Sequence, residues 1–430
     1  MRRWLATMPI LCAAAFPIHP RATTPVLIAW LLAVGWSALR HPGEERPKEH
    51  PFAWWATLVH YAFIALWLLA SKDLDAGLFA LEVKISLLLM PFLWGQTTRW
   101  VHVPRSHLAQ GLFAGLAISA FAGWGDALWS SVMAGDHSGW RYAELSGALH
   151  PTYSAWYWAM GALLWLSDGD RARPVGGTLV AGAMLGLLAS KAGWIAGLAV
   201  FVGAFAMGWH RRAAAVGAVV LVVAGVSVGQ GRALEWLQGL QRAAPVEVAM
   251  EMPPAAATPS GSTAGRLQSW KAARSVMKEH PLGVGTGDVR TALVAEYEAD
   301  GAVYAAEHRM NAHNAFLEAG VAFGWPGLLW LMGWWGSVLV VALRRQDVAA
   351  AGFVALAAWM GLTESTFELQ SGVVWIAFGF WAWGPNRRSA ELLRRPPLHD
   401  RSGAAADEVP CVHLKLDGDE AAGREPIGLA

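Results

Sequence analysis

Residues 309–327 read R-M-N-A-H-N-A-F-L-E-A-G-V-A-F-G-W-P-G, and they join the only long polar insertion of the chain to an apolar run. His313, Leu317 and Gly320 are spaced i, i+4 and i+7, which predicts that they share one helical face. The closing Gly-Trp-Pro-Gly predicts a break or kink in that helix. A titratable ring beside a broken helix at a membrane boundary indicates a functional site, although an interfacial His–Asn helix cap would give the same pattern.

The composition indicates an integral membrane protein. The 430 residues are 55% hydrophobic and only 15% charged, with a mean hydropathy of +0.34, whereas soluble domains carry about 25% charged residues. The 26 tryptophans point the same way, because tryptophan concentrates at membrane–water interfaces. The net charge of +1 gives no indication of a nucleic-acid partner. Cys12 and Cys411 form no disulfide framework or metal-ligand pair, and we expect no metal and no cofactor.

Apolar runs of roughly 17–25 residues predict about twelve transmembrane helices in an all-α fold. They fall near 4–18, 23–39, 52–70, 76–96, 107–133, 150–167, 175–189, 192–209, 213–229, 314–343, 347–363 and 370–384. The chain then divides into helices 1–9 at 1–229, a large loop with amphipathic helices at 230–312, helices 10–12 at 313–384, and a polar tail at 385–430 that we expect to be disordered.

The distribution of Lys and Arg predicts the orientation. If the N-terminus is cytoplasmic, the short outer loops hold only Arg21, Lys72, Arg141 and Lys191, while the inner loops collect most of the other cations. Both termini are then cytoplasmic and the loop at 230–312 is periplasmic. The first seventeen residues resemble a signal peptide, but a first membrane span fits better because apolar segments continue at once.

The large loop has a patterned sequence. It contains an amphipathic piece at 232–242, a Pro/Ala/Ser/Thr/Gly stretch at 253–265 that we expect to be flexible, a helix at 266–279, the run G-V-G-T-G-D at 283–288, and a helix at 289–299. The glycine run lacks the G-K-S/T ending of a P-loop. We interpret it as a flexible turn that lets the main chain approach a ligand.

Cations outnumber carboxylates among the polar groups of the outer face, which suits an anionic ligand such as a diphosphate. Arg266 begins a helix, where main-chain N–H groups also favour anions. Arg274 follows on the same helix, and Lys191 lies at the tip of a hairpin between two spans. The alternatives are a solvated amphipathic helix for the two arginines and snorkelling to the headgroups for Lys191. Arg141 is a further outer cation.

Other polar groups have less specific patterns. His150 and Tyr153 open the sixth span, where they form either an interfacial cap or part of a site. Glu364 and Glu368 are spaced i, i+4, so on a helix they would share a face and orient a base or hold a sugar hydroxyl, unless they simply face water. Asn314 and Glu318 lie at the mouth of the tenth span, beside His313.

Two charged residues lie inside the fourth expected span. Glu82 and Lys84 are two positions apart, so they do not share a helical face. Charges within a membrane span are unfavourable unless they are paired. We therefore expect each to find a partner on another helix, in a structural role.

At this point the motifs resemble a known family. H-N-A-F-L-E-A-G-V-A-F-G-W-P-G resembles the His-Asn motif of the O-antigen ligase and polymerase superfamily. The preceding A-G-R-L-Q-S-W and P-L-G-V-G-T-G are similar to the segments that approach that motif, and A-S-K-A-G-W-I-A-G-L resembles the hairpin segment, with Lys191 where arginine is usual. L-E-V-K-I-S-L-L-L-M-P, L-H-P-T-Y-S-A and G-L-T-E-S-T-F-E-L-Q-S-G also resemble ligase-like members, so the resemblance covers about 80–384.

The resemblance implies a GT-C-like membrane glycosyltransferase of the bacterial inner membrane. Such enzymes transfer a glycan from an undecaprenyl-diphosphate carrier to an acceptor, lipid A-core or another glycan or protein, on the periplasmic face. They are metal-independent. Carried over, His313 is the general base, and Lys191 and Arg266 engage the diphosphate. Lysine at position 191 offers the diphosphate a single ammonium group, whereas the usual arginine offers a planar guanidinium that can donate two parallel hydrogen bonds.

The chemistry fits the residue types. An acceptor hydroxyl is a poor nucleophile and needs a base with a pKa near neutrality, while the diphosphate leaving group needs cations. A direct displacement inverts the anomeric configuration without a carboxylate pair. Three alternatives stay open: a polymerase that extends the glycan on its carrier, an oligosaccharyltransferase that modifies protein, and a transporter of lipid-linked sugars that uses the broken helix at 320–327 as a gate.

Overall fold

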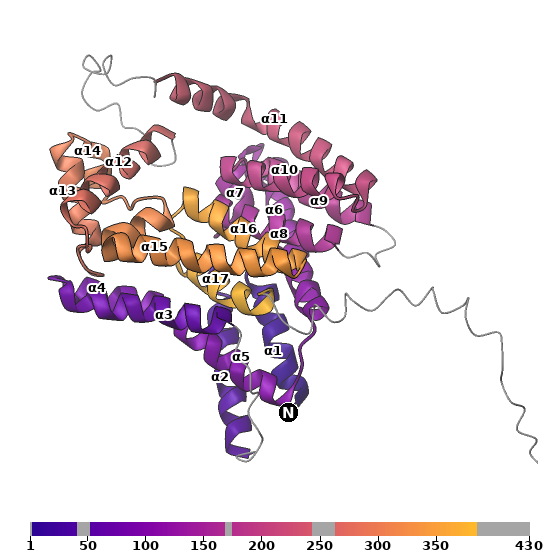
Figure 1. Ribbon diagram of the computed structural model, residues 1–430. Coiled ribbons are helices and arrows are strands. Elements are labelled where there is room, and N and C mark those ends of the chain that lie inside the picture. The colour runs from indigo at the N-terminus through magenta and orange to yellow at the C-terminus, as the bar shows by residue number, and fades with distance from the viewer. Residues whose placement is uncertain (1, 41–51, 168–173, 243–262, 385–430) are drawn as a thin grey trace, which may run out of the picture. The chain divides into compact units, whose positions relative to one another are not determined.

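The computed structural model describes most of the chain (Figure 1). Its described residues are 2–40, 52–167, 174–242 and 263–384, and within them the chain forms helices and loops without strands. This agrees with the expected all-α fold. The expected tail at 385–430, and the part of the expected flexible stretch at 253–262, lie outside the described residues.

Seventeen α-helices and two short 3-10 helices follow one another along the described residues. They are α1 (Arg2–Ala15), α2 (Thr23–Arg40), α3 (Phe52–Trp67), η1 (Leu68–Ala70), α4 (Leu74–Val83), α5 (Ser86–Trp100), α6 (Arg105–Ala134), η2 (Ser138–Trp140), α7 (Tyr142–Ser146), α8 (Pro151–Ser167), α9 (Pro174–Leu187), α10 (Lys191–Ala206), α11 (Arg211–Arg242), α12 (Thr263–Glu279), α13 (Val289–Ala299), α14 (Val303–Glu307), α15 (Ala315–Arg344), α16 (Val348–Thr363) and α17 (Gln370–Ala382).

Five of the described segments are long and apolar enough to cross a membrane: α2, α4 with α5, α6, the first part of α11, and α15. The other seven expected spans fall on helices of 13–17 residues, namely α1, α3, α8, α9, α10, α16 and α17. The protein is therefore a multi-pass membrane protein, and the count of twelve spans stays a prediction.

Two helices that are apolar on all sides form the centre of the bundle. Nearly every residue of α8 and α17 is buried, as expected for a helix without a polar face. Their aromatic side chains meet, with the ring centroids of Tyr157 and Trp375 4.9 Å apart. By contrast, α2 and α6 leave large apolar side chains such as Leu32 and Phe121 exposed, which suits contact with lipid.

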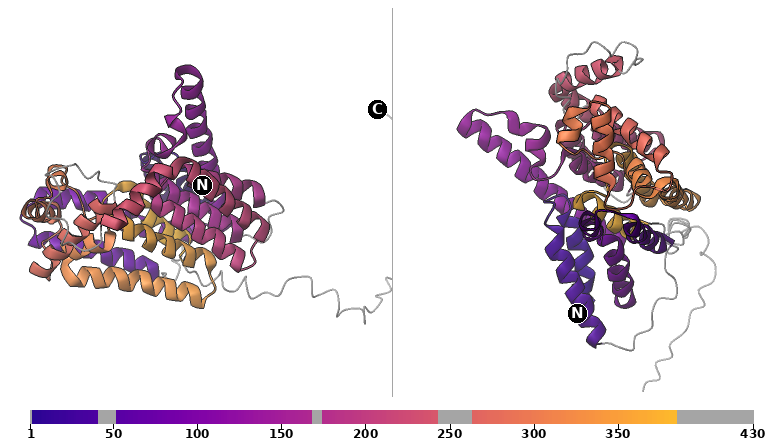
Figure 2. Two further views of the ribbon diagram at one scale, coloured as in Figure 1. Left: turned by 90° about the horizontal axis from the view of Figure 1, so that it is seen from above. Right: turned by 90° about the vertical axis from the view of Figure 1, so that its left-hand side faces the viewer.

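Helices α8, α9, α10 and α11 pack on one another, with α9 and α11 in extensive contact (Figure 2). The helix α11 continues to Arg242, past the end that the sequence predicts for the ninth span at 229. The amphipathic piece expected at 232–242 is therefore the continuation of α11 rather than a separate helix. The expected hairpin at Ser190-Lys191 is formed by the short connection between α9 and α10.

The helices α12, α13 and α14 build a small second core with the first part of α15. Ala273, Met277, Leu293 and Val321 are buried together there. The observed bounds of α12 and α13 agree closely with the helices expected at 266–279 and 289–299. This second core holds α12, and with it Arg266, against the N-terminal half of α15.

The break expected in the tenth span lies at Gly324. This residue has φ 68° and ψ −162° inside α15, and Pro326 follows two positions later without a backbone N–H. The helical hydrogen bonds are interrupted there. The backbone groups that are freed need other partners, because an unpaired backbone group in a membrane bundle is strongly unfavourable.

The glycine-rich loop at 281–288 supplies those partners. Its three backbone hydrogen bonds to the kink are Val284 N to Val321 O (2.9 Å), Gly285 N to Ala322 O (3.1 Å) and Trp325 N to Pro281 O (2.9 Å). Gly283 and Gly285 adopt positive φ to make this approach. At the other end, the Asp288 carboxylate accepts the backbone N–H groups of Lys72 and Asp73. The described contacts join the loop to α15 and the start of α4, and the approach of its main chain to a ligand stays a prediction.

Candidate functional site

The start of α15 is fixed by Asn314. Its side-chain Oδ1 accepts the backbone N–H groups of Phe316 (2.9 Å) and Leu317 (3.0 Å), and its Nδ2 donates to Leu362 O (3.1 Å). Asn314 is thus an N-cap and also ties α15 to the end of α16. The alternative of a His–Asn helix cap is therefore correct for Asn314. His313 is not the capping residue, and its role has to be judged from its own contacts.

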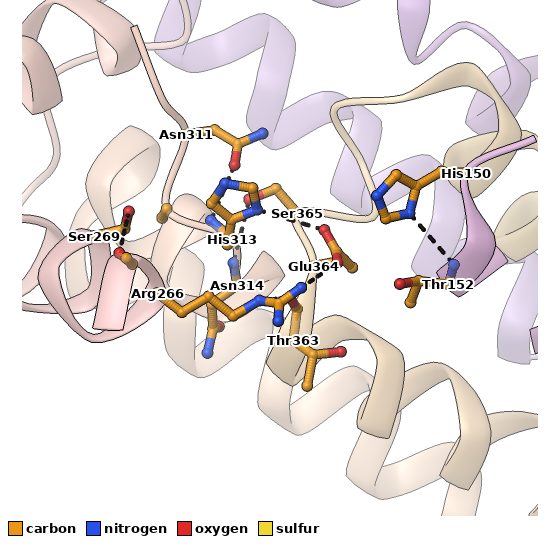
Figure 3. A network of polar contacts seen from close by, with 12 residues as sticks. His150, Thr152, Arg266, Ser269, Asn311, His313, Asn314, Thr363, Glu364 and Ser365 are labelled. Atoms are coloured by element: carbon orange, nitrogen blue, oxygen red, sulfur yellow. Dashed lines mark hydrogen bonds and ion pairs between the residues drawn. The ribbon is translucent and has the colours of Figure 1, made fainter. Parts of the chain in front are cut away.

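His313 lies before the helix, in a left-handed backbone conformation with φ 46°. The prediction that it shares a helical face with Leu317 and Gly320 is wrong, because α15 begins at Ala315. The Asn311 side chain accepts the His313 backbone N–H at 3.0 Å and supports this turn. The turn directs the imidazole away from α15 and towards the loop that follows α16 (Figure 3).

A His–Glu–Arg cluster forms where α12, α15 and α16 meet (Figure 3). His313 Nδ1 lies 3.5 Å from Glu364 Oε2, and Arg266 Nη2 lies 2.6 Å from Glu364 Oε1. Arg266 Nε also donates to Thr363 O at 3.1 Å. The side chains of His313 and Arg266 are 20% and 19% exposed, so both stay reachable, whereas that of Glu364 is only 10% exposed.

Glu364 is held as a carboxylate. Burial by itself would raise its pKa, but the hydrogen bond with His313 and the charges of Arg266, His150 and His313 together lower the pKa of Glu364 below its usual range. An ionised Glu364 favours the proton of His313 on Nδ1, which leaves Nε2 as the basic atom. The arrangement can therefore take a proton from a hydroxyl that approaches Nε2.

Glu318 lies beneath the cluster and is buried. Its Oε2 accepts the Ala312 backbone N–H at 2.8 Å and the Ser365 hydroxyl at 3.1 Å. Ser365 Oγ in turn accepts the Asn314 backbone N–H at 3.2 Å. Glu318 therefore holds the residue before His313 through its backbone N–H and the residue after Glu364 through its hydroxyl, and so helps to position both.

His150 precedes α8 and lies on the other side of Glu364 from His313 (Figure 3). His150 is exposed as a residue, although protein surrounds and desolvates much of its imidazole. This desolvation lowers the pKa of His150, and the charges of Arg266 and His313 lower it further against the opposing charge of Glu364. Tyr153 packs against it, with ring centroids 6.2 Å apart, and is itself buried.

Lys191 is placed at this side of the cluster by the start of α10. Ser190 caps α10 by accepting the Gly193 N–H, and its hydroxyl lies 3.2 Å from the Thr152 hydroxyl. Because Thr152 is two residues from His150 and its N–H donates to His150 Nδ1 (3.3 Å), the N-terminus of α10 lies beside the first turn of α8. Lys191 is the first residue of that helix.

Three of the expected site residues lie elsewhere. Arg141 is exposed and lines a separate cavity with residues of η2 and α11. Arg274 is exposed two turns after Arg266, and its Nε donates to Trp270 O. Glu368 forms an ion pair with Lys84, at 2.9 Å. The chain from Glu364 to Leu369 is not helical, so the prediction of a shared helical face for Glu364 and Glu368 is wrong.

The sequence analysis missed Ser365, Asn311 and Thr363. Ser365 makes two hydrogen bonds, with the Asn314 N–H and with Glu318, whereas Asn311 accepts one and Thr363 contributes its backbone carbonyl, so residue type alone carried little signal. The T-E-S-T-F-E segment between two apolar runs was the available hint, because Ser365 lies directly beside Glu364.

Comparison with known proteins identifies one family. Residues 176–332 match the family model described as O-antigen ligase. The matched range runs from α9 into α15 and includes Lys191, Arg266 and His313, whereas His150 and Glu364 lie outside it. The match agrees with the superfamily that the motifs resemble. No curated protein matches the sequence.

Proposed function

We propose, from the match of residues 176–332 to the O-antigen ligase family model, that this chain transfers a glycan from an undecaprenyl-diphosphate carrier to an acceptor hydroxyl. The reaction would take place at the periplasmic face of the bacterial inner membrane, with both termini of the chain in the cytoplasm. The observation that carries the proposal is the cluster of His313, Glu364 and Arg266.

In the proposed step the acceptor hydroxyl gives its proton to His313 Nε2 while its oxygen attacks the anomeric carbon. The bond from that carbon to the diphosphate oxygen breaks, and the carrier diphosphate leaves with the electron pair. Arg266 uses two of its five N–H donors on Thr363 and Glu364, so three remain for phosphate oxygens. Lys191 adds a second cation.

The test is complementation of a strain that lacks the gene, with analysis of its glycans. The wild-type chain should restore transfer, and His313→Ala should fail although the protein inserts and folds. His308→Ala is the matched control, because His308 is an exposed histidine of the same segment whose ring stacks on Tyr304, with centroids 4.0 Å apart. Full activity of His313→Ala would reject the proposed base.

The glycan profile of the deletion strain separates the alternatives. Unligated chains on the carrier indicate a ligase, single-repeat products indicate a polymerase, and loss of a glycosylated protein indicates an oligosaccharyltransferase. A transporter would move labelled lipid-linked sugar across liposomes without forming a glycosidic bond. For the donor site, the double variant Arg266→Gln with Lys191→Gln should weaken donor binding and leave acceptor binding unchanged; unaltered donor affinity would reject that assignment.

A further inference from the structure

A polar cavity that is not lined by His313, Arg266 or Glu364 is lined in part by Ser365 and Glu368 of the segment between α16 and α17. Five separate elements bring polar residues to it, among them His60 of α3, Lys84 between α4 and α5, Thr286 of the glycine-rich loop, Glu318 of α15 and Glu368 before α17. The outer part has a volume of about 270 Å³ and reaches the exposed Arg290 and Arg309, and a chamber of about 40 Å³ continues inward to His60.

The charges of this cavity are buried within an otherwise apolar bundle. The Lys84 side chain is 7% exposed and its Nζ lies 2.9 Å from Glu368 Oε1. Glu318 is buried nearby and lines the same space. Lys84 therefore has a partner on another element, although this partner lies in the segment before α17 and not on a helix as expected. A buried ion pair is weak support for stability alone, and ionisable groups inside a membrane bundle commonly mark a functional site.

His60 supplies an independent observation. It is 2% exposed, it lines the inner chamber, and its Nδ1 has no hydrogen-bond partner among the described residues. Its ring packs beside Phe367, with centroids 4.7 Å apart. A buried nitrogen without a partner is unfavourable, so this atom points to a partner that the chain itself does not provide.

We propose that this cavity binds one uncharged sugar ring of the glycan substrate. Carboxylates and an imidazole nitrogen accept hydrogen bonds from sugar hydroxyls, Lys84 donates to them, and Phe323 and Phe367 offer apolar walls. The volume is at the lower end of ligand sites, which suits one ring rather than a lipid chain. The inference rests on the proposed function for the identity of its ligand.

The cavity is a subsite and lies apart from the reacting atoms. Ala315 and Ser365 line its inner chamber and lie between it and the His–Glu–Arg cluster. A sugar held there would belong to a part of the donor or acceptor glycan away from the bond that forms. The His–Glu–Arg cluster offers cations for a diphosphate. The two parts of the cavity are together lined by the carboxylates of Asp73, Glu318 and Glu368 and the cations Lys84, Arg290 and Arg309, and this balanced set favours a ligand with hydroxyl groups.

The test is protection of an introduced thiol at the rim. Thr291 is exposed and lines the cavity, so Thr291→Cys can be labelled with a maleimide in a Cys411→Ser background, while Cys12 is buried. The probes are the carrier-linked glycan and the acceptor fraction, both extracted from the deletion strain, and undecaprenyl diphosphate without glycan. A glycan-bearing probe should slow labelling at least fivefold. Protection by the carrier-linked glycan would assign the bound sugar to the donor, and protection by the acceptor fraction would assign it to the acceptor. Ser138→Cys, in the cavity beside Arg141, should show no protection.

Two further variants keep the proposal separate from the proposed function. In His313→Ala the protection should persist although transfer is lost, because binding at the subsite needs no reaction. His60→Phe keeps an aromatic ring and removes the unpartnered nitrogen, so it should weaken glycan binding three- to tenfold while the melting temperature stays equal or rises. Absence of protection by every glycan probe in an active Thr291→Cys protein, or equal protection by the bare carrier, would overturn the proposal.

Discussion

Replacing Glu364 with Gln tests the arrangement of the candidate site most directly. Glu364 gives one oxygen to Arg266 at 2.6 Å and the other to His313 at 3.5 Å. Glutamine has nearly the same shape but no charge, and only one of its two terminal atoms accepts a hydrogen bond. His313 would lose the carboxylate that favours its proton on Nδ1. Positioned general bases contribute about 10²–10⁴ in rate, so we expect kcat for glycan transfer to fall at least about 100-fold, or roughly 2.7 kcal/mol.

The effect on folding should be much smaller. The ion-paired side chains of Arg266 and Glu364 are 19% and 10% exposed, so this pair is intermediate between surface and fully buried pairs. Surface pairs contribute about 0–1 kcal/mol to stability, whereas breaking a fully buried pair costs about 3–5 kcal/mol. We therefore expect Glu364→Gln to lower the free energy of unfolding by about 1–3 kcal/mol. The protein should still purify as a folded species whose melting temperature is a few degrees lower.

The assay measures glycan transfer and thermal unfolding on the same purified protein in detergent. Asp300→Asn is the matched control. Asp300 forms an ion pair at 2.9 Å with Lys271, which lies on the same helix α12 as Arg266, but this pair is more exposed. The substitution should leave both kcat and the melting temperature nearly unchanged. If Glu364→Gln retains more than a third of wild-type kcat, the carboxylate does not orient the base, and the reasoning from the His313–Glu364 contact fails.

Three further predictions concern the fold around the site. Asn314→Ala removes an N-cap and should cost about 1–2 kcal/mol of stability in chemical denaturation, whereas Asn314→Ser should restore most of it. Gly324→Ala places a Cβ against the backbone of residues 281–282 at φ 68° and should lower the melting temperature, while Gly333→Ala, in open space on the same helix, should be neutral or stabilising; equal effects would contradict the kink. Because the folded protein lowers the pKa of both Glu364 and His150, the unfolded state binds more protons in acid: stability should fall as the pH drops below about 6.5 for His150 and below about 4.5 for Glu364, and His150→Ala should lessen the first loss in thermal scans from pH 7 to pH 5.

Local signals in the sequence predicted the helices well. The helix at 266–279 has its apolar residues in register and ends before Pro281, and the observed α12 ends at Glu279. The Gly-Trp-Pro-Gly sequence predicted the break in α15, because proline cannot donate the helical hydrogen bond and glycine accepts positive φ. These features depend on neighbours within a few positions, which is why sequence patterns can detect them.

The contacts of the site could not be predicted in the same way. Helical spacing placed His313 on α15 and put Glu364 and Glu368 on one face, but Asn314 takes the cap position and the 364–369 segment is not helical. His313 and Glu364 are 51 positions apart, so their contact is set by how α15 and α16 pack. The glycine-rich loop shows the same limit, since its partner is the kink in α15. Single-sequence periodicity carries no information about such partners.

The short segment between α16 and α17 connects the two polar regions of the protein. Glu364 faces His313 and Arg266, whereas Glu368, four residues later, pairs with Lys84 in the second cavity. Between them, Ser365 bonds both to the start of α15 and to Glu318. Glu364, Ser365 and Glu368 each hold this non-helical segment to another part of the chain. A displacement of Glu368 is therefore expected to move Glu364 as well. If a sugar binds against Lys84 or Glu368 as proposed, it would also influence the position of the carboxylate that orients His313.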